Sequence, residues 1–168
     1  MQLPWLALLI AAMLLAATPQ SSAQEAAANL IPNGGFERDE NGDGMADDWS
    51  FSGNESVKVS WSREEGVEGQ YSQKLECAAF EYTSPASHVM LAQVDTFALE
   101  EGQWYRISFW VKGEGIPGGA ASVAIRQTAP WEDLGLTQGF RVRGEWEQVA
   151  FAFRSPKTIS ENIRLQIW

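Results

Sequence analysis

The sequence predicts an all-β fold, a β-sandwich or jelly roll of two antiparallel sheets. Three observations support this prediction. Apolar and polar residues alternate with a period of two along several segments, clusters of turn-forming residues separate these segments, and no stretch shows a convincing 3.6-residue repeat with helix caps. About eight short strands at this spacing are typical of two packed sheets.

The chain opens with a segment typical of an export signal. Residues 6–17 are apolar and uncharged, and Ser21-Ser22-Ala23 has the small-x-small form that signal peptidases cut. This run is shorter than the ~20 residues that a membrane-spanning helix needs. We therefore expect a signal peptide at 1–23, a spacer at 24–28 and a secreted or cell-surface domain at 29–168. An uncleaved anchor is the alternative.

The strand pattern is clearest in four segments, and each offers one apolar face to a core. The apolar sets are Val57, Val59 and Trp61; Tyr105, Ile107, Phe109 and Val111; Val149, Phe151 and Phe153; and Ile163, Leu165 and Ile167. The last alternation is still running at Trp168. Because proteins ordinarily shield an unpaired edge, we expect that the last strand of the domain is missing and that the natural chain continues.

The charge balance argues against two classes of partner. The chain has 12 basic and 22 acidic residues, a net charge of −10, which disfavours binding to nucleic acid or to anionic membranes. The domain contains one cysteine, so no intramolecular disulfide is expected. Cys77 alternates with Leu75 and Ala79, which predicts a small buried residue rather than a nucleophile.

An acidic loop has the residue spacing of a calcium site. Counting from Asp39, oxygen-bearing side chains stand at positions 1, 3, 5 and 9, and glycine at position 6 permits the sharp bend. Position 12 is Ser50 where an EF-hand has glutamate, so the loop looks more like those of thrombospondin-type repeats and dockerins. We predict a structural Ca²⁺ here, and a plain Asx-rich turn is the alternative. The predicted ligands in the loop are Asp39, Asn41, Asp43, Asp47 and Asp48.

Four segments in order resemble the landmarks of a known family. The segment 29–37 (NLIPNGGFE) and the acidic loop resemble the opening of carbohydrate-binding modules of the family 4 and 9 grouping, in the galactose-binding-like superfamily. Segments 69–75, 102–113 and 144–153 resemble its later landmarks. The resemblance implies a jelly roll that binds a polysaccharide and accompanies a glycoside hydrolase. It also implies a calcium ion held partly by Glu37, together with a carboxylate from a last strand that is absent here.

Strand alternation indicates where a sugar would bind. A pyranose ring suits a flat aromatic side chain flanked by planar hydrogen-bonding groups. Trp110, Arg126 and Gln166 lie opposite the apolar rows of their strands and supply these groups, unless Trp110 packs beneath a loop or against the missing strand. Trp49, Trp61, Trp104 and Trp146 are predicted to be structural. The candidate carbohydrate-binding residues are Trp110, Arg126, Gln166 and Arg106 on strands, and Trp131 and Tyr82 in loops.

The sequence contains no pattern for catalysis. It has no G-x-S-x-G elbow, HExxH helix or P-loop, and its one dense carboxylate cluster has calcium spacing. We therefore predict a non-catalytic, monomeric module that binds a plant or microbial β-glycan, with any hydrolase activity in a missing downstream domain. The rival prediction is a cell-surface protein-interaction or spacer domain of the same fold.

Overall fold

The structure, a computed structural model, describes residues 29–67 and 69–168. The predicted signal peptide (1–23) and spacer (24–28) lie outside the described residues. In the described part, no helix is long and apolar enough to cross a membrane.

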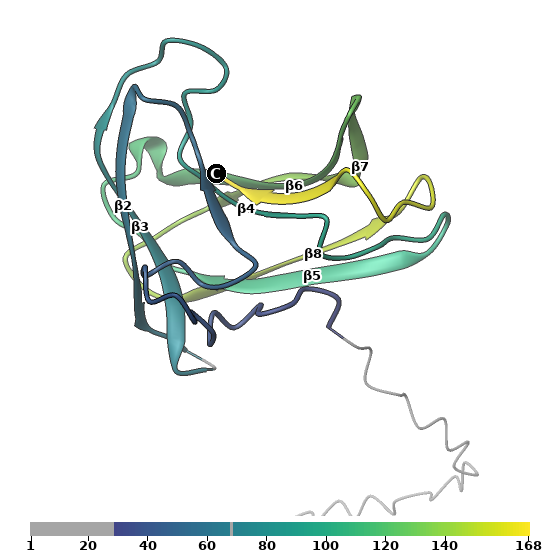
Figure 1. The fold of residues 1–168 in the computed structure, drawn as a ribbon, viewed down its shortest axis with the longest axis horizontal. Helices are drawn as coiled ribbons and strands as arrows, with labels where there is room; N and C mark the ends of the chain where they lie inside the picture. Colours follow the sequence, from purple (N-terminus) through teal and green to yellow (C-terminus); the bar gives the residue numbers. More distant parts are fainter. Residues whose placement is uncertain (1–28, 68) are drawn as a thin grey trace, which may run out of the picture.

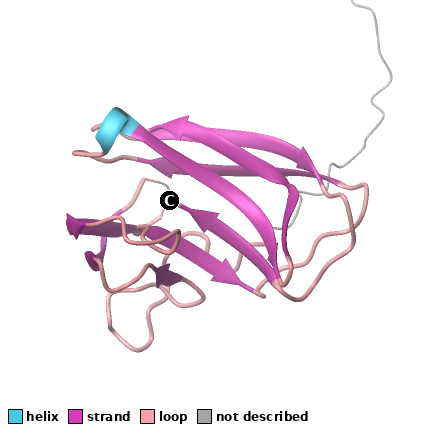
Figure 2. Cartoon of the chain, turned by 90° about the horizontal axis from the view of Figure 1, so that it is seen from above, coloured by secondary structure: helices cyan, strands magenta, loops and turns pink. Residues whose placement is uncertain are grey.

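The described chain consists of strands and loops, with one short 3-10 turn, η1 (Pro117–Gly119) (Figure 2). The all-β prediction is confirmed. The strands are β1 (Ser50–Ser52), β2 (Val57–Glu65), β3 (Tyr71–Phe80), β4 (Met90–Val94), β5 (Trp104–Val111), β6 (Ala120–Thr128), β7 (Trp131–Arg141), β8 (Glu147–Arg154) and β9 (Ile163–Ile167).

Five strands form an antiparallel sheet in the order β1-β4-β9-β6-β7. Strand β9 lies in the middle of this sheet, with Leu165 opposite Gln93 of β4 and Ile125 of β6. The sequence pattern suggested that the last strand of the chain is an unpaired edge. This expectation is wrong, because β9 is paired on both sides. The expectation that the natural chain continues past Trp168 stays a prediction.

A second layer, made of β5 and β8, packs against one face of the five-stranded sheet (Figure 1). The core between the layers contains Val123, Ile125, Leu134, Leu136 and Leu165 from the sheet, with the half-buried Ile107, Phe109 and Phe151 packed against them. All of these except Leu134 and Leu136 belong to apolar rows that alternation assigned to the interior. The β-sandwich prediction is thus confirmed.

The third strand pair, β2 and β3, lies at one end of the sandwich (Figure 1). Trp61 of β2 stacks on Phe51 of β1, with ring centroids 5.8 Å apart. In the described residues β3 pairs only with β2, and Cys77 on β3 is exposed. The prediction that Cys77 is buried is therefore wrong, because alternation gives its face but not whether a neighbouring element covers that face.

Candidate functional site

The face of the five-stranded sheet that points away from β5 and β8, here the outer face, gathers polar and aromatic side chains. Its residues alternate with the core residues of the same strands, so Gln166 and Arg164 lie on the side opposite to Leu165. The loop between β3 and β4 and the hairpin between β6 and β7 both rise on this side of the sheet (Figure 1). The residues used below are Arg126, Trp131, Arg164, Gln166 and Trp168.

The floor of the outer face is made of small or closely covered residues. Gln166 lies between Ala92 of β4 and Ala124 of β6 as their register partner. Both alanines are fully buried and Gln166 is only 7% exposed, although all three point away from the core. The floor is therefore recessed beneath longer side chains of neighbouring rows.

Arg164 is one of those longer side chains. Its register partner is Val94, yet its Nη2 reaches the Sδ of Met90, four residues earlier on β4, at 3.0 Å. The guanidinium thus extends across Ala92. Burial lowers the pKa of Arg164, since desolvation penalises the charged form, and its Nε is buried with no hydrogen-bond partner. This is a desolvated cation whose donors are poorly satisfied.

Strand β7 contains a bulge beside Arg126, near one end of the outer face. Ile125 pairs with Leu136 and Arg126 with Asp133, so β7 accommodates Leu134 and Gly135 as extra residues at this step. Gly135 has φ +97°, and a Cβ there would lie 2.3 Å from the carbonyl oxygen of Arg154. Only glycine fits this position. The bulge keeps Leu134 in the core and Asp133 on the outer face.

An exposed indole lies near each end of the outer face. Trp131, at the start of β7, is 60% exposed, and Trp168, two residues after Gln166, is 37% exposed. The row of Trp131 lies three steps of two residues from Trp168, past Gln166 and Arg164. This separation is about 20 Å along the strands. That length suits an oligosaccharide rather than a single sugar ring.

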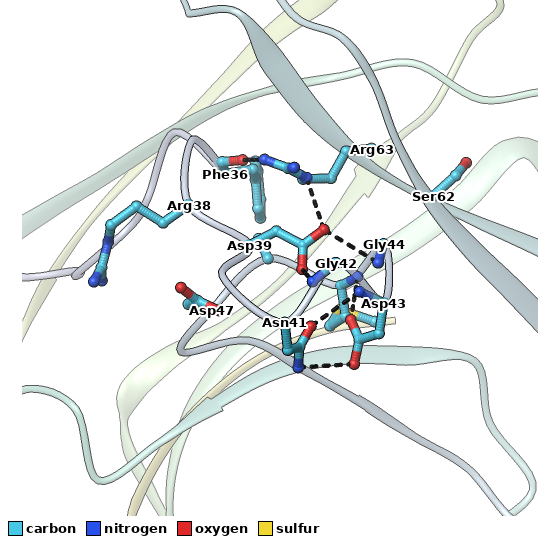
Figure 3. Close-up of polar contacts among 12 residues, drawn as sticks. Phe36, Arg38, Asp39, Asn41, Gly42, Asp43, Gly44, Asp47, Ser62 and Arg63 are labelled. Carbon is cyan, nitrogen blue, oxygen red and sulfur yellow. Dashed lines mark hydrogen bonds and ion pairs between the residues drawn. The ribbon is translucent and has the colours of Figure 1, made fainter.

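The acidic loop is held together by its own hydrogen bonds and by an arginine (Figure 3). Asp39 accepts hydrogen bonds from the backbone N–H groups of Gly42 (2.9 Å) and Gly44 (3.2 Å). Its Oδ2 also pairs with Nε of Arg63 at 3.3 Å, and the Asp39 side chain is only 4% exposed. Arg63 in turn donates to the Glu37 carbonyl and lies over the Tyr71 ring. A guanidinium therefore stands where a cation would meet Asp39.

The other predicted calcium ligands also have protein partners. Asp43 accepts from the N–H of Met45, Asn41 from the N–H of Asp43, and Asp47 from the N–H of Glu40. Asp48 pairs with Arg38, and Glu37 accepts the N–H of Gln70. Within 29–67 and 69–168, no three Asp, Glu, His or Cys side chains are grouped as metal ligands would be. In this arrangement the predicted ligands are engaged by protein groups, and the calcium site stays a prediction.

Comparison with known families identifies the chain. The family model described as "Carbohydrate binding domain", of the family 4 and 9 grouping, matches residues 28–168. The chain belongs to this family. It is a carbohydrate-binding module, as the four sequence landmarks predicted.

Three solved structures were compared with the module, and the first of them supports its fold. A structure titled "CBM4 structure and function" matches with a TM-score of 0.55 and 21% identity, over 82% of this chain and 86% of that chain. The structure "BiXyn10A CBM1 APO" matches with a TM-score of 0.49 and 12% identity, over 71% and 82%. A Clostridium thermocellum xylanase 10B fragment (CBM22-1-GH10 modules complexed with xylohexaose) matches with a TM-score of 0.45 and 19% identity, over 72% and 23%. No curated protein matched.

The module brings together three of the six predicted carbohydrate-binding residues. Arg126, Gln166 and Trp131 share the outer face. Tyr82 lies in the loop between β3 and β4 and is exposed.

Arg106 and Trp110 lie elsewhere, on the outward side of β5 in the second layer. The expectation that Trp110 joins Arg126 and Gln166 on one platform is corrected by this topology. Trp110 is half-buried, and its indole N–H has no partner among the described residues. Trp104, predicted to be structural, is 70% exposed on the same side of β5.

Two residues of the outer face were left out of the predicted site. Arg164 and Trp168 alternate with the core residues exactly as Gln166 does, so the signal that placed Gln166 also applied to them. What the sequence lacked was the register between β6 and β9, which makes Arg164 the direct partner of Arg126.

Proposed function

We propose that the outer face of the five-stranded sheet binds a polysaccharide chain, which runs along the row from Trp168 to Trp131. One observation carries this proposal: planar hydrogen-bonding side chains, namely Arg126, Arg164 and Gln166, lie between two exposed indoles on one face.

The chemistry of these side chains suits a sugar chain. An indole offers an apolar plane for the C–H face of a pyranose ring, and it loses little conformational entropy on binding. Amide and guanidinium groups donate in fixed planes, which matches hydroxyl groups around a ring edge. The alanines beside Gln166 are covered, so a sugar would rest on the longer side chains above them, Arg164 among these.

We further propose that this module is exported, monomeric and non-catalytic, and that it accompanies a glycoside hydrolase acting on a plant or microbial β-glycan. Support comes from the family match and from the apolar leader at 6–17. A tethered module of this kind raises the concentration of substrate near the enzyme without chemistry of its own.

Affinity electrophoresis of the chain tests the proposed function. We expect slower migration in gels that contain at least one of xylan, β-glucan, mannan or alginate, relative to a gel without polysaccharide. Bovine serum albumin in the same gels controls for sieving. Unchanged mobility in every gel would contradict polysaccharide binding.

A further inference from the structure

Two arginines lie on the outer face without an acidic partner. Arg126 of β6 and Arg164 of β9 are register partners on neighbouring strands. Their guanidinium groups turn away from each other, that of Arg126 toward Thr137 on β7 and that of Arg164 toward Met90 on β4. None of the five ion pairs among the described residues includes either of them.

The contacts that these arginines do make are weak. Nη2 of Arg126 lies 3.5 Å from Oγ1 of Thr137, at the limit of a hydrogen bond. Nη2 of Arg164 meets only the thioether sulfur of Met90, a poor acceptor. Most of the guanidinium donors of the pair therefore have no protein acceptor in the described structure.

The nearest acidic residue in the register is already used. Asp133 is the register partner of Arg126 on β7, on the side opposite to Arg164. Its Oδ1 accepts the N–H of Gly135 at 2.7 Å, and its Oδ2 accepts the hydroxyl of Thr137. The carboxylate is thus turned along its own strand, and it forms no ion pair with Arg126 within 4.0 Å.

Two cations without acidic partners are unusual on one face of an acidic protein. The chain has a net charge of −10, yet Arg126 and Arg164 both lie on the outer face, between the exposed indoles of Trp131 and Trp168. Guanidinium groups bind carboxylates in a planar, bidentate way, and such charge-assisted bonds are about twice as strong as neutral ones. A carboxylate beside either arginine would supply the missing acceptors.

We propose that Arg126 and Arg164 bind carboxylates of uronic acid residues, so that the preferred ligand of this module is an acidic polysaccharide. The proposal rests on the proposed function and narrows its ligand class. The uronic acid residues sit over the middle of the outer face, with neighbouring sugars extending toward Trp131 and Trp168.

Calorimetric titration with matched polymers tests this proposal. The probes are glucuronoxylan and alginate, each compared with the same polymer after reduction of its carboxyl groups to primary alcohols. We expect the native chain to bind at least one acidic polymer about tenfold or more tightly than its reduced form. We also expect this preference to shrink at high salt, because ions screen charge attraction.

Variants locate the preference on the two arginines. We expect Arg126→Gln and Arg164→Gln each to lower affinity for the acidic polymer toward that for its reduced form. Arg106→Gln, a matched change on the second layer, should keep the preference. Because Arg126 has only the long contact to Thr137, its glutamine variant should fold. If Arg164→Gln does not fold, Arg126→Gln alone tests the proposal.

The outcomes separate the two proposals. Equal binding of acidic and reduced polymers would overturn the uronic acid proposal while leaving polysaccharide binding intact. Binding of neither form of any of these polymers would overturn the uronic acid proposal, and together with unchanged mobility in every gel it would overturn both. An equal loss in Arg106→Gln and Arg126→Gln would also overturn the uronic acid proposal, since it would show an effect of overall charge.

Discussion

Replacing Leu165 with alanine should lower the free energy of unfolding by about 2–5 kcal/mol. Leu165 lies on the central strand β9, between Gln93 and Ile125, and its side chain is almost fully buried in the core. The variant loses the burial of the leucine and leaves a cavity that a close-packed core fills only in part. Urea unfolding followed by tryptophan fluorescence measures the change.

Leu30→Ala is the matched control, because Leu30 is exposed. Its effect should stay within about 0.5 kcal/mol. A loss below about 1 kcal/mol in Leu165→Ala would contradict the position of β9 in the centre of the sandwich.

Replacing Asp39 with alanine should lower the free energy of unfolding by about 2–3 kcal/mol. The change removes the acceptor for the N–H groups of Gly42 and Gly44 and leaves the largely buried Arg63 without its carboxylate. Removing one partner of a buried ion pair costs about 3–5 kcal/mol, and the carbonyl groups that still accept from Arg63 reduce this loss. Urea unfolding of the variant and of the native chain gives the difference.

Asp48→Asn is the control for this loop. Asp48 has a positive φ of +70°, which asparagine tolerates, so the change removes only the more exposed pair with Arg38. That pair should be worth about 0–1 kcal/mol. Equal losses in the two variants would contradict the role given to Arg63.

Alternation along single strands was the most reliable signal in the sequence. The period of two correctly separated Ile107 and Phe109, in the core, from Arg106 on the outward side of β5. It did the same for Leu165 and Gln166 on β9. This succeeds because the face of a side chain is a local property, fixed by the pleat of its own strand.

Properties that depend on other strands could not be predicted in this way. Trp110 and Gln166 both point away from the core, but they belong to different layers, and only long-range pairing assigns strands to layers. Likewise Trp104 is exposed and Ala92 is buried although both point outward. Burial depends on whether side chains of neighbouring rows cover the residue. The partner of Asp39 was also hidden, since Arg63 comes from a strand more than twenty residues along the chain.

The most direct test of the account compares two exposed tryptophans from the two layers. Trp131 lies on the outer face of the five-stranded sheet and Trp104 on the outward side of β5, and both are largely exposed, so their alanine variants should fold. Isothermal titration with the polysaccharide that retards the native chain most gives the affinities. The account predicts that Trp131→Ala weakens binding about tenfold and that Trp104→Ala leaves it unchanged. Loss of binding in Trp104→Ala with full binding in Trp131→Ala would contradict it.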